Sequence, residues 1–544
     1  MMLKKIILPL VFLLGFTYVQ AQDSHVSDVT RVSLPDAPEK APDNWYRLDP
    51  QADHFKGVSS DKAYAELLKD KKSKTVIVAI IDSGIDIEHE DLKDNIWVNP
   101  GEIAGNGIDD DKNGYIDDVN GWNFIGNAKG EMINNDNLEV TRLYVKYKKQ
   151  YEGKTASDFK GKKLAAFNEY VKIKEDFESR INKANTTLAN IEGFVAAINS
   201  ADSTMKAELQ KDDYTMEEVS AFKSDKEDVK KAQQILGYTA MMKISAEDMQ
   251  EGVDYYKDQL AYNLNPEFEP RALVGDDYSN VKEKYYGNNK VEGPDAMHGT
   301  HVAGIIGAVR NNGIGMDGIA GDVKIMVVRT VPNGDERDKD VANSIYYAVN
   351  NGAKIINMSF GKNYSPYKKQ VDKAMKYAEK KGVLLVHAAG NDANNNDLGG
   401  NYPAATYLKG NKKCKTWVEI GASSWEEKGN FVAEFSNYGK KTVDVFAPGV
   451  QIYSTVPNNK YKNLQGTSMA SPVVAGVAAL VLSYYPNLTA VQLKEILMKS
   501  ATNYGSSEVN LPGAKKKVKF EELSQTGGIV NAYEALKMAE SMSK

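Results

Sequence analysis

The sequence contains a single cysteine, Cys414, among its 544 residues. No disulfide can form within one chain that has one thiol, so a packed core, with or without bound metal, must stabilise the fold. Cys414 follows a basic segment and has no histidine near it in sequence. We therefore expect a buried or incidental thiol rather than a nucleophile.

The sequence also lacks an excess of positive charge. Its 68 Lys and Arg residues are spread along the chain and are outnumbered by 74 Asp and Glu residues, which gives a net charge of −6. Hydrophobic residues make up 42% and charged residues 26%, as is usual for a globular protein. Without a basic patch, a nucleic-acid partner is not expected.

Long apolar runs are scarce. Lys4 and Lys5 precede the apolar run 6–17, and Ala21 ends a segment of small residues suited to cleavage. This pattern predicts a signal peptide over 1–21, with a membrane anchor as the alternative. No cysteine follows the run to carry a lipid, and no later stretch is expected to span a bilayer. We therefore expect export to the periplasm or the extracellular medium, without a stable membrane anchor.

Proline is absent between Pro100 and Pro266, where apolar residues recur at helical spacing over 164–198. This pattern predicts a helical insertion over 135–265, folded as a hairpin or small bundle. Two sequences inside it resemble capping boxes that open helices, "TMEE" (215–218) and "SAED" (245–248).

Outside this insertion, short continuous apolar runs rich in β-branched residues predict strands buried on both faces. The runs are 75–81, 323–330, 353–360, 382–390, 416–423 and 443–449. Helical patterns over 340–352 and 367–382 lie between some of them and end at glycine. The alternation predicts an α/β domain over 75–134 and 266–544 with a mostly parallel central sheet, whose ligands bind at the carboxyl ends of the strands.

Three motifs carry residues suited to nucleophilic catalysis. Asp82 ends the first strand in "AIIDSGI", His298 opens "HGTHVAGIIGA", and Ser468 stands in "GTSMASPVVAG". The histidine and the serine each lie at the entrance of a helix lined by small residues. A serine hydroxyl becomes a good nucleophile only when a positioned imidazole takes its proton, and a carboxylate must hold that imidazole.

These motifs closely resemble the active-site motifs of subtilisin-like serine proteases, the subtilase family, in the same order Asp, His, Ser. The resemblance extends to five shorter segments, which occur in the same order as in the family: "INMSFG", "AAGN", "YPAA", "FSNYG" and "FAPG". It covers about 75–125 and 290–535. It implies a bacterial secreted subtilase with the three-layer subtilisin-like fold and a long helical insertion between the catalytic Asp and His. The implied enzyme is an endopeptidase that cleaves proteins or peptides through an acyl-enzyme, without a catalytic cofactor.

The resemblance assigns roles residue by residue. Ser468 is the nucleophile, His298 the general base and Asp82 the acid that orients it. Asn391, in "HAAGN", supplies the side-chain donor of the oxyanion hole, and the Ser468 backbone amide supplies the second donor. His301, three residues after His298, is expected to be a packed structural histidine.

The resemblance also implies the substrate-binding walls. One wall is an edge strand, the other faces it across the primary specificity pocket, and Asn401 lies at the floor. The wall residues are Ser359, Phe360 and Gly361 on the first side, and Ala388, Ala389 and Gly390 on the second. No acidic residue is evident at these walls, so we expect broad specificity for uncharged or apolar side chains.

A second motif, "DDDKNGYIDDVN" (109–120), matches the first part of an EF-hand-type calcium loop, with Gly114 at the sixth place. Asn120 stands where a bidentate Glu is usual, and no clear helix precedes the loop. The motif favours a structural calcium site, with a solvated acidic turn as the alternative. The candidate ligands are Asp109, Asp111, Asn113, Tyr115 and Asp117.

The chain departs from the common subtilase pattern before residue 75. The segment 22–74 is short for a folded inhibitory prodomain and is read as an N-terminal extension or short pro-segment. Three alternatives remain: a peptide-binding or chaperone-like protein on a disabled protease fold, a serine-carboxyl relative, and an adhesion or scaffold module in which the insertion binds its own partner. His298 and Asn391 argue against the first two, because those classes replace one or both residues.

Overall fold

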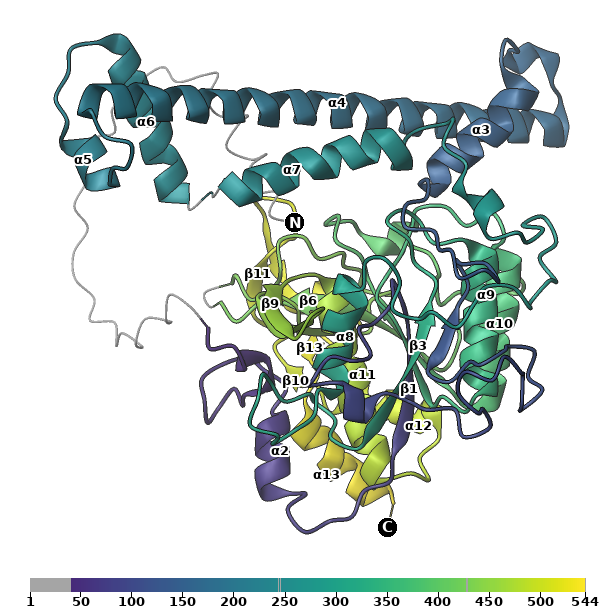
Figure 1. Cartoon of the computed structure of the whole chain (residues 1–544). Helices are drawn as coiled ribbons and strands as arrows, with labels where there is room; N and C mark the ends of the chain where they lie inside the picture. The colour runs from purple at the N-terminus through teal and green to yellow at the C-terminus, as the bar shows by residue number, and fades with distance from the viewer. Residues whose placement is uncertain (1–40, 243, 245, 427–428, 544) are drawn as a thin grey trace. The chain divides into compact units, whose positions relative to one another are not determined.

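The computed structural model describes residues 41–242, 244, 246–426 and 429–543, so the predicted signal peptide lies outside the described residues. The chain divides into two compact units. Of the described residues, 140–268 form one unit, and 41–139 together with those from 269 onward form the other (Figure 1). Each unit is described separately below.

The larger unit is built on a nine-stranded sheet in the order β10-β13-β7-β6-β5-β4-β1-β3-β2. Every neighbouring pair is parallel except β10 and β13. The strands are β1 (Val76–Asp82), β2 (Gly121–Asn123), β3 (Val323–Arg329), β4 (Ile355–Met358), β5 (Leu384–Ala388), β6 (Trp417–Ser423), β7 (Val445–Pro448), β10 (Thr502–Asn503) and β13 (Gly528–Ile529). The predicted α/β fold with a mostly parallel sheet is confirmed.

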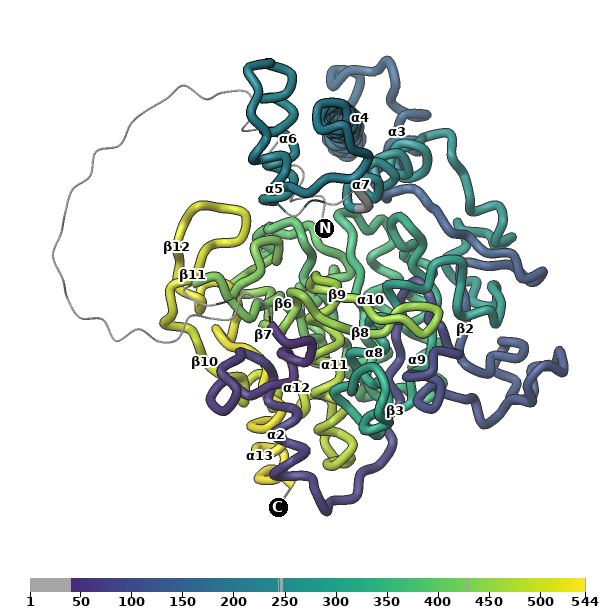
Figure 2. The backbone as a smooth tube through the Cα atoms, turned by 60° about the vertical axis from the view of Figure 1, so that its left-hand side comes forward, coloured from purple at the N-terminus to yellow at the C-terminus, as the bar shows by residue number. Residues whose placement is uncertain are grey.

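Helices cover both faces of this sheet because successive side chains on each strand point to opposite sides. On β1, Val78 and Ile80 belong to one apolar cluster, which includes α8 and α11, whereas Ala79 and Ile81 belong to a second cluster, which includes α9 and α10. Helices α9 and α10 lie side by side (Figure 1 and Figure 2). The helices are α2 (Ser60–Glu66), α8 (Met297–Gly307), α9 (Asp338–Asn350), α10 (Lys368–Lys381), α11 (Thr467–Tyr484), α12 (Ala490–Lys499) and α13 (Ala532–Met542).

Helix α11 corrects one expectation about apolar runs. Its length and composition would allow it to cross a membrane, although no such stretch was expected after the signal peptide. In the structure, 89% of this 18-residue helix is buried inside the protein. It packs there against β4, β5, β6 and β7. A fully buried core helix is apolar on every side for the same reason that a membrane helix is.

The described part of the N-terminal extension packs into the same core. Trp45 and Tyr46 are fully buried, and the Trp45 indole N–H donates to the Gln451 carbonyl O at 3.2 Å. The backbone N–H of Ala532 also donates to the Val58 carbonyl O at 2.7 Å. This packing favours an integral extension over a removable pro-segment for the residues from 41 onward. The unit also contains two small antiparallel sheets, β8 (Ile452–Val456) with β9 (Lys460–Leu464) and β11 (Glu508–Asn510) with β12 (Lys517–Lys519).

The second unit is helical and is dominated by the 49-residue helix α4. The rings of Tyr144 and Phe177 stack with centroids 4.2 Å apart, and this contact joins α3 to α4. Thr215 and Glu218 form the predicted capping box at the start of α5, whereas Ser245 of the second predicted box lies outside the described residues. The helices are α3 (Glu139–Tyr151), α4 (Gly161–Leu209), α5 (Met216–Ala221), α6 (Glu227–Met242) and α7 (Ala246–Asp258).

Candidate active site

The sheet brings several predicted site residues to one edge. Asp82 is the last residue of β1, Ser359 follows β4, and Ala388 ends β5. These three strands are neighbours and run parallel, so their carboxyl ends meet at the same edge. Asp82 is only 2% exposed at this edge. A buried carboxylate is costly unless a hydrogen-bond donor or an opposite charge lies beside it.

A close contact between two backbones brings His298 to Asp82. A Cβ atom built on Gly299 would lie 2.1 Å from the Gly84 carbonyl O, so only glycine allows helix α8 to begin this close to the end of β1. The result is a hydrogen bond of 2.6 Å from His298 Nδ1 to Asp82 Oδ1, which also accepts from the Ser83 N–H at 2.8 Å. Residues 216 positions apart in sequence therefore form one pair.

The electrostatics of this pair favour a basic imidazole. Burial lowers the pKa of His298, but the charge of Asp82 and its hydrogen bond outweigh burial, so the pKa lies above its usual value. The carboxylate accepts from Nδ1–H, which leaves Nε2 of the neutral tautomer as the acceptor. The side chain is 38% exposed, so Nε2 has access to a ligand.

Ser468 is the second residue of helix α11 and is paired with Ser359. Ser468 Oγ donates to the Ser359 carbonyl O at 3.0 Å, and Ser359 Oγ donates to the Ser468 carbonyl O at 2.9 Å. The Ser468 carbonyl is available because Pro472, four residues on in the helix, has no N–H to donate to it. Among the described residues, no hydrogen bond joins Ser468 Oγ to His298.

Asn391 has a fixed amide orientation beside Ser468. Its Oδ1 accepts from the Thr467 backbone N–H at 2.8 Å and from the Thr467 hydroxyl at 3.0 Å. A backbone N–H can only donate, so the accepting atom must be oxygen and the NH₂ group points elsewhere. Within the described residues, neither this NH₂ nor the Ser468 backbone N–H has a hydrogen-bond acceptor. Both donors are therefore available to a ligand.

A cavity of about 300 Å³ adjoins these residues, and a larger one of about 390 Å³ shares Gly400 and Asn401 with its lining. The smaller cavity contains the predicted Phe360, Gly361, Ala388, Gly390 and Asn401 in its lining, together with Ser468 and Asn391. Ser359 and Ala389, which were also predicted to form these walls, are not part of this lining. Ala389 is fully buried, and its carbonyl O accepts from three asparagine side chains, Asn396, Asn401 and Asn437.

The lining of the smaller cavity differs from the sequence prediction in one respect. Glu336 and Asp392 both contribute to it, although no acidic residue was evident at the predicted walls. Glu336 comes from the loop before α9, which no motif links to the site. Burial raises the pKa of the Glu336 carboxyl above its usual value, although the charge of Lys362 acts in the opposite direction.

Two other residues singled out from the sequence are buried away from this chemistry. His301 is fully buried and its Nε2–H donates to the Lys462 carbonyl O at 3.0 Å. Burial lowers the pKa of His301 to about 3, so the ring stays neutral. Cys414 is also buried, and burial raises the pKa of its thiol, which makes it a poor nucleophile.

The acidic loop brings two of the predicted calcium ligands, Asp109 and Asp111, close to a third carboxylate. Carboxylate oxygens of Glu102, Asp109 and Asp111 lie within 4.8 Å of one another, and Glu102 was not among the predicted ligands. Asp117 instead accepts from the backbone N–H groups of a turn at 2.8 to 3.2 Å, those of Gly105, Asn106 and Gly107. Asp117 is not part of this carboxylate cluster.

The comparisons with known proteins agree with the motifs. The sequence profile of the Subtilase family matches residues 73–515, which is most of the chain. The chain belongs to the subtilase family. Since the profile begins and ends within the larger unit, the match includes both sides of the helical insertion.

Individual relatives of this subtilase are proteases. The chain is 40% identical to Subtilisin DY of Bacillus licheniformis over 39% of this chain and 72% of that protein. It is 37% identical to Subtilisin Savinase of Lederbergia lenta over 39% of this chain and 72% of that protein. It is also 37% identical to a Thermostable alkaline protease of Halalkalibacterium halodurans over 43% of this chain and 59% of that protein. The subtilase is therefore a subtilisin-like serine endopeptidase.

Proposed function

We propose that this subtilase is an exported endopeptidase that hydrolyses peptide bonds with Ser468 as nucleophile, His298 as base and Asp82 as orienting acid. The observation that carries the proposal is the 2.6 Å hydrogen bond between His298 Nδ1 and the buried Asp82 carboxylate, which leaves Nε2 as a proton acceptor. Export rests on the signal-peptide pattern over 1–21.

The first chemical step begins with a rotation of Ser468 about its Cα–Cβ bond. Oγ leaves the Ser359 carbonyl and turns toward His298, a change that costs one modest hydrogen bond. His298 Nε2 then takes the hydroxyl proton while Oγ forms a bond to the carbonyl carbon of the substrate. Catalytic hydrogen bonds that are absent in the free enzyme often form only when substrate is bound.

Collapse of the tetrahedral intermediate breaks the C–N bond, and His298 returns its proton to the departing amine. Water then attacks the acyl-enzyme with His298 as base again, and Ser468 is regenerated. Asp82 keeps its negative charge throughout and stabilises the imidazolium that forms in each half of the reaction. No cofactor is needed for these proton transfers.

The negative oxygen of each intermediate needs donors already in place. The Asn391 NH₂ and the Ser468 backbone N–H are proposed to supply them. The two hydrogen bonds from Thr467 to Asn391 Oδ1 support this role, because they fix the amide before substrate arrives. The Ser468 N–H also lies at the N-terminus of α11, where the helix dipole favours negative charge.

Proteins or peptides are the proposed substrates, with uncharged or apolar side chains in the primary pocket. The substrate is proposed to pair with the strand that includes Ser359, Phe360 and Gly361, and to place its side chain between this strand and the wall at Ala388 to Gly390. The lining of the smaller cavity supports this assignment. Lys362 in the same lining is paired with Glu139 at 2.8 Å and Asp338 at 2.9 Å, so it adds no free positive charge.

A structural calcium ion is the proposed bound metal. Glu102, Asp109 and Asp111 offer carboxylate oxygens, the ligands that calcium prefers, within one small volume. Asp109 also accepts from the N–H groups of Asn113 and Gly114, which gives the loop a preformed turn. The ion would hold the loop and takes no part in the proposed peptide hydrolysis.

The proposal is tested by mass spectrometry of peptides released from a mixed protein substrate, with Ser468→Ala as the control. Wild-type protein should release peptides with a common pattern before the cleaved bond, and the variant should release none. If wild-type protein retains unfolded substrates without cutting them, the fold is a binding module and the proposed catalysis is wrong.

A further inference from the structure

The orientation of the Asn401 side chain is fixed by three acceptors. Its Nδ2 donates to the Ala389 carbonyl O at 2.9 Å, to the Glu419 carboxylate at 3.1 Å and, more weakly, to the Ala388 carbonyl O at 3.3 Å. An atom that faces two carbonyl oxygens and a carboxylate can only be the NH₂ nitrogen, since oxygen there would meet three lone pairs. The opposite atom of the amide is therefore Oδ1.

This Oδ1 points between the two walls of the smaller cavity. A Cβ atom built on Gly361 would lie 2.5 Å from Asn401 Oδ1, and one built on Gly390 would lie 3.9 Å from it. Gly361 and Gly390 belong to opposite walls. Within the described residues, Oδ1 has no hydrogen-bond donor. The cavity thus presents an unused acceptor at its floor.

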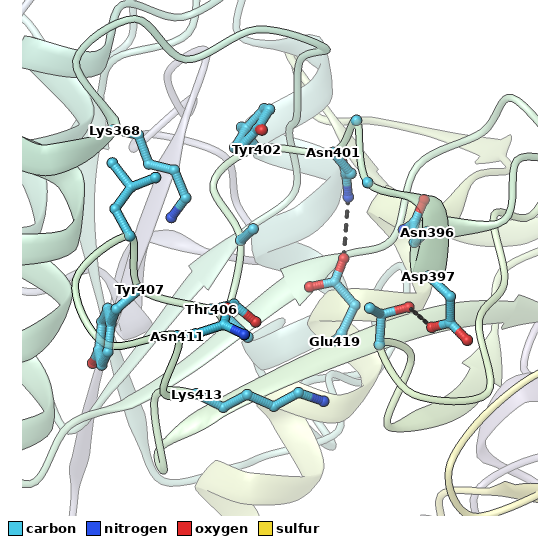
Figure 3. Close-up of a pocket in the computed structure, with 16 residues that line it drawn as sticks. Lys368, Asn396, Asp397, Asn401, Tyr402, Thr406, Tyr407, Asn411, Lys413 and Glu419 are labelled. Atoms are coloured by element: carbon cyan, nitrogen blue, oxygen red, sulfur yellow. Dashed lines mark hydrogen bonds between the residues drawn. The ribbon is translucent and has the colours of Figure 1, made fainter.

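Glu419 holds the amide in this orientation from behind. The carboxylate is 6% exposed, and its other oxygen accepts from Trp417 Nε1–H at 2.7 Å and from His387 Nδ1 at 3.1 Å. Glu419 lines the larger cavity, where Figure 3 shows its hydrogen bond to Asn401, and Asn401 contributes to the lining of both cavities. Because Glu419 can only accept from Asn401, it prevents the amide from turning its NH₂ toward the smaller cavity.

We propose that Asn401 selects substrates whose side chain before the cleaved bond ends in a hydrogen-bond donor, as glutamine does. This inference rests on the proposed function of the smaller cavity. A donor at the end of the side chain pairs with Asn401 Oδ1, whereas a side chain without one leaves that oxygen unpaired when substrate excludes water. A carboxylate in the same place meets both Oδ1 and the negative charge of Glu419. Glu419 is a positioning residue, because it acts through Asn401.

The test uses three tetrapeptide substrates that differ only in the residue before the cleaved bond, which is Gln, Glu or Met. The three side chains have similar length, so donor and charge are the main variables. For wild-type protein, kcat/KM should be about tenfold higher for Gln than for Glu. The Gln side chain gains a hydrogen bond to Asn401 Oδ1, and it avoids the repulsion that the Glu carboxylate meets there. In Asn401→Ala, kcat/KM for Gln should fall about 3- to 10-fold relative to Met, because the floor acceptor is lost.

Glu419→Gln tests the positioning role. The two donors from Trp417 and His387 require the oxygen of the new amide, so its NH₂ faces the NH₂ of Asn401. The Gln-over-Glu preference, measured as the ratio of kcat/KM for the two substrates, should therefore shrink several-fold. Asn411→Ala is the matched control, because Asn411 lines the larger cavity but not the smaller one.

Two results would overturn the inference. One is a Gln-to-Met ratio that Asn401→Ala leaves unchanged, and the other is a wild-type preference for Glu over Gln. Either result with active enzyme refutes only the role of Asn401. If wild-type protein cleaves none of the three peptides and no protein substrate, the proposed function itself fails.

Discussion

At the scale of single residues, the Asp82 carboxylate accounts for two properties of His298. It fixes the tautomer through the 2.6 Å hydrogen bond, and it raises the pKa of the ring against the effect of burial. Both properties favour proton transfer from Ser468, since a stronger base takes the hydroxyl proton more readily. The cost is that the base becomes protonated, and inactive, at a higher pH.

A pH profile of kcat/KM checks this pair. Only the neutral imidazole accepts a proton, so activity should be full above the pKa of His298 and fall as the pH drops through it. The midpoint should lie above about 6.5, the usual histidine value. Asp82→Asn should lower turnover and move the remaining midpoint toward acid. A wild-type midpoint clearly below 6.5 would mean that burial, not Asp82, dominates.

Asn391→Ala should lower kcat about 10²–10³-fold and leave KM nearly unchanged, because the donor acts on charge that exists only in the transition state. This is the loss found for one oxyanion donor in subtilisin, a relative of this chain. Asn394→Ala, an exposed asparagine three residues on, is the matched control. If the loss appears mainly in KM, Asn391 shapes the pocket instead.

The sequence predicted residues in contiguous motifs and missed those that only the fold brings together. Asp82, His298, Ser468 and Asn391 each stand in a motif that can be read directly. Glu102 and Glu419 stand in no motif, and neither could be placed beside Asp111 or Asn401 without the fold. The two hydrogen bonds between Ser359 and Ser468 could not be predicted either. One of them forms because Pro472 has no N–H and so leaves the Ser468 carbonyl O free to accept from Ser359.

At the scale of elements, the strands were predictable because each is a continuous apolar run. All six predicted runs contain an observed strand, and β1 differs from its prediction by one residue at each end. Strands β2, β10 and β13 have two or three residues each, too few for a pattern to be recognised. Apolar spacing over 164–198 predicted a helix where α4 lies, but it gave no reason to expect the burial of Tyr170, whose ring packs against Tyr151 of α3 with centroids 5.7 Å apart.

The acidic loop is an element whose proposed calcium can be tested by stability. An ion that binds only the folded protein adds about 2.7 kcal/mol at 100 times its Kd. Chelation should therefore lower the melting temperature of wild-type protein, and Asp111→Ala should abolish the calcium dependence. Asp212→Ala, at an exposed aspartate of the insertion, should retain it. If the melting temperature of the wild-type protein is the same with calcium and with chelator, the loop is only an acidic turn.

At the scale of the whole molecule, the 140–268 unit can be removed at sites that the structure defines. The predicted limits, 135–265, would cut away Asp136 and Glu139, which pair with Arg337 at 2.7 Å and Lys362 at 2.8 Å in the peptidase unit. Arg271, just beyond the other end, binds Asp340 in the same unit. Replacement of 140–268 by a short Gly-Ser linker leaves these pairs intact.

Two roles for the insertion predict different effects of this deletion. If the insertion limits access to the active site, cleavage of large proteins should rise several-fold while cleavage of a chromogenic tetrapeptide stays constant. If it only binds a partner, the rates on both substrates should be unchanged. Gating is the hypothesis that this deletion tests, and a projection that binds a partner or nothing is the alternative. Equal rates before and after deletion would contradict it.

The central claim, that Ser468 is the nucleophile of an Asp82–His298–Ser468 triad, is tested most directly by covalent labelling. The folded wild-type protein is treated with an organophosphonate and digested, and the site of the added mass is located by mass spectrometry. The account predicts one adduct, on Ser468, with loss of activity in proportion to labelling and almost no adduct in His298→Ala, in which the triad is disabled. Labelling of a different serine, or full peptidase activity in a folded Ser468→Ala protein, would contradict the account.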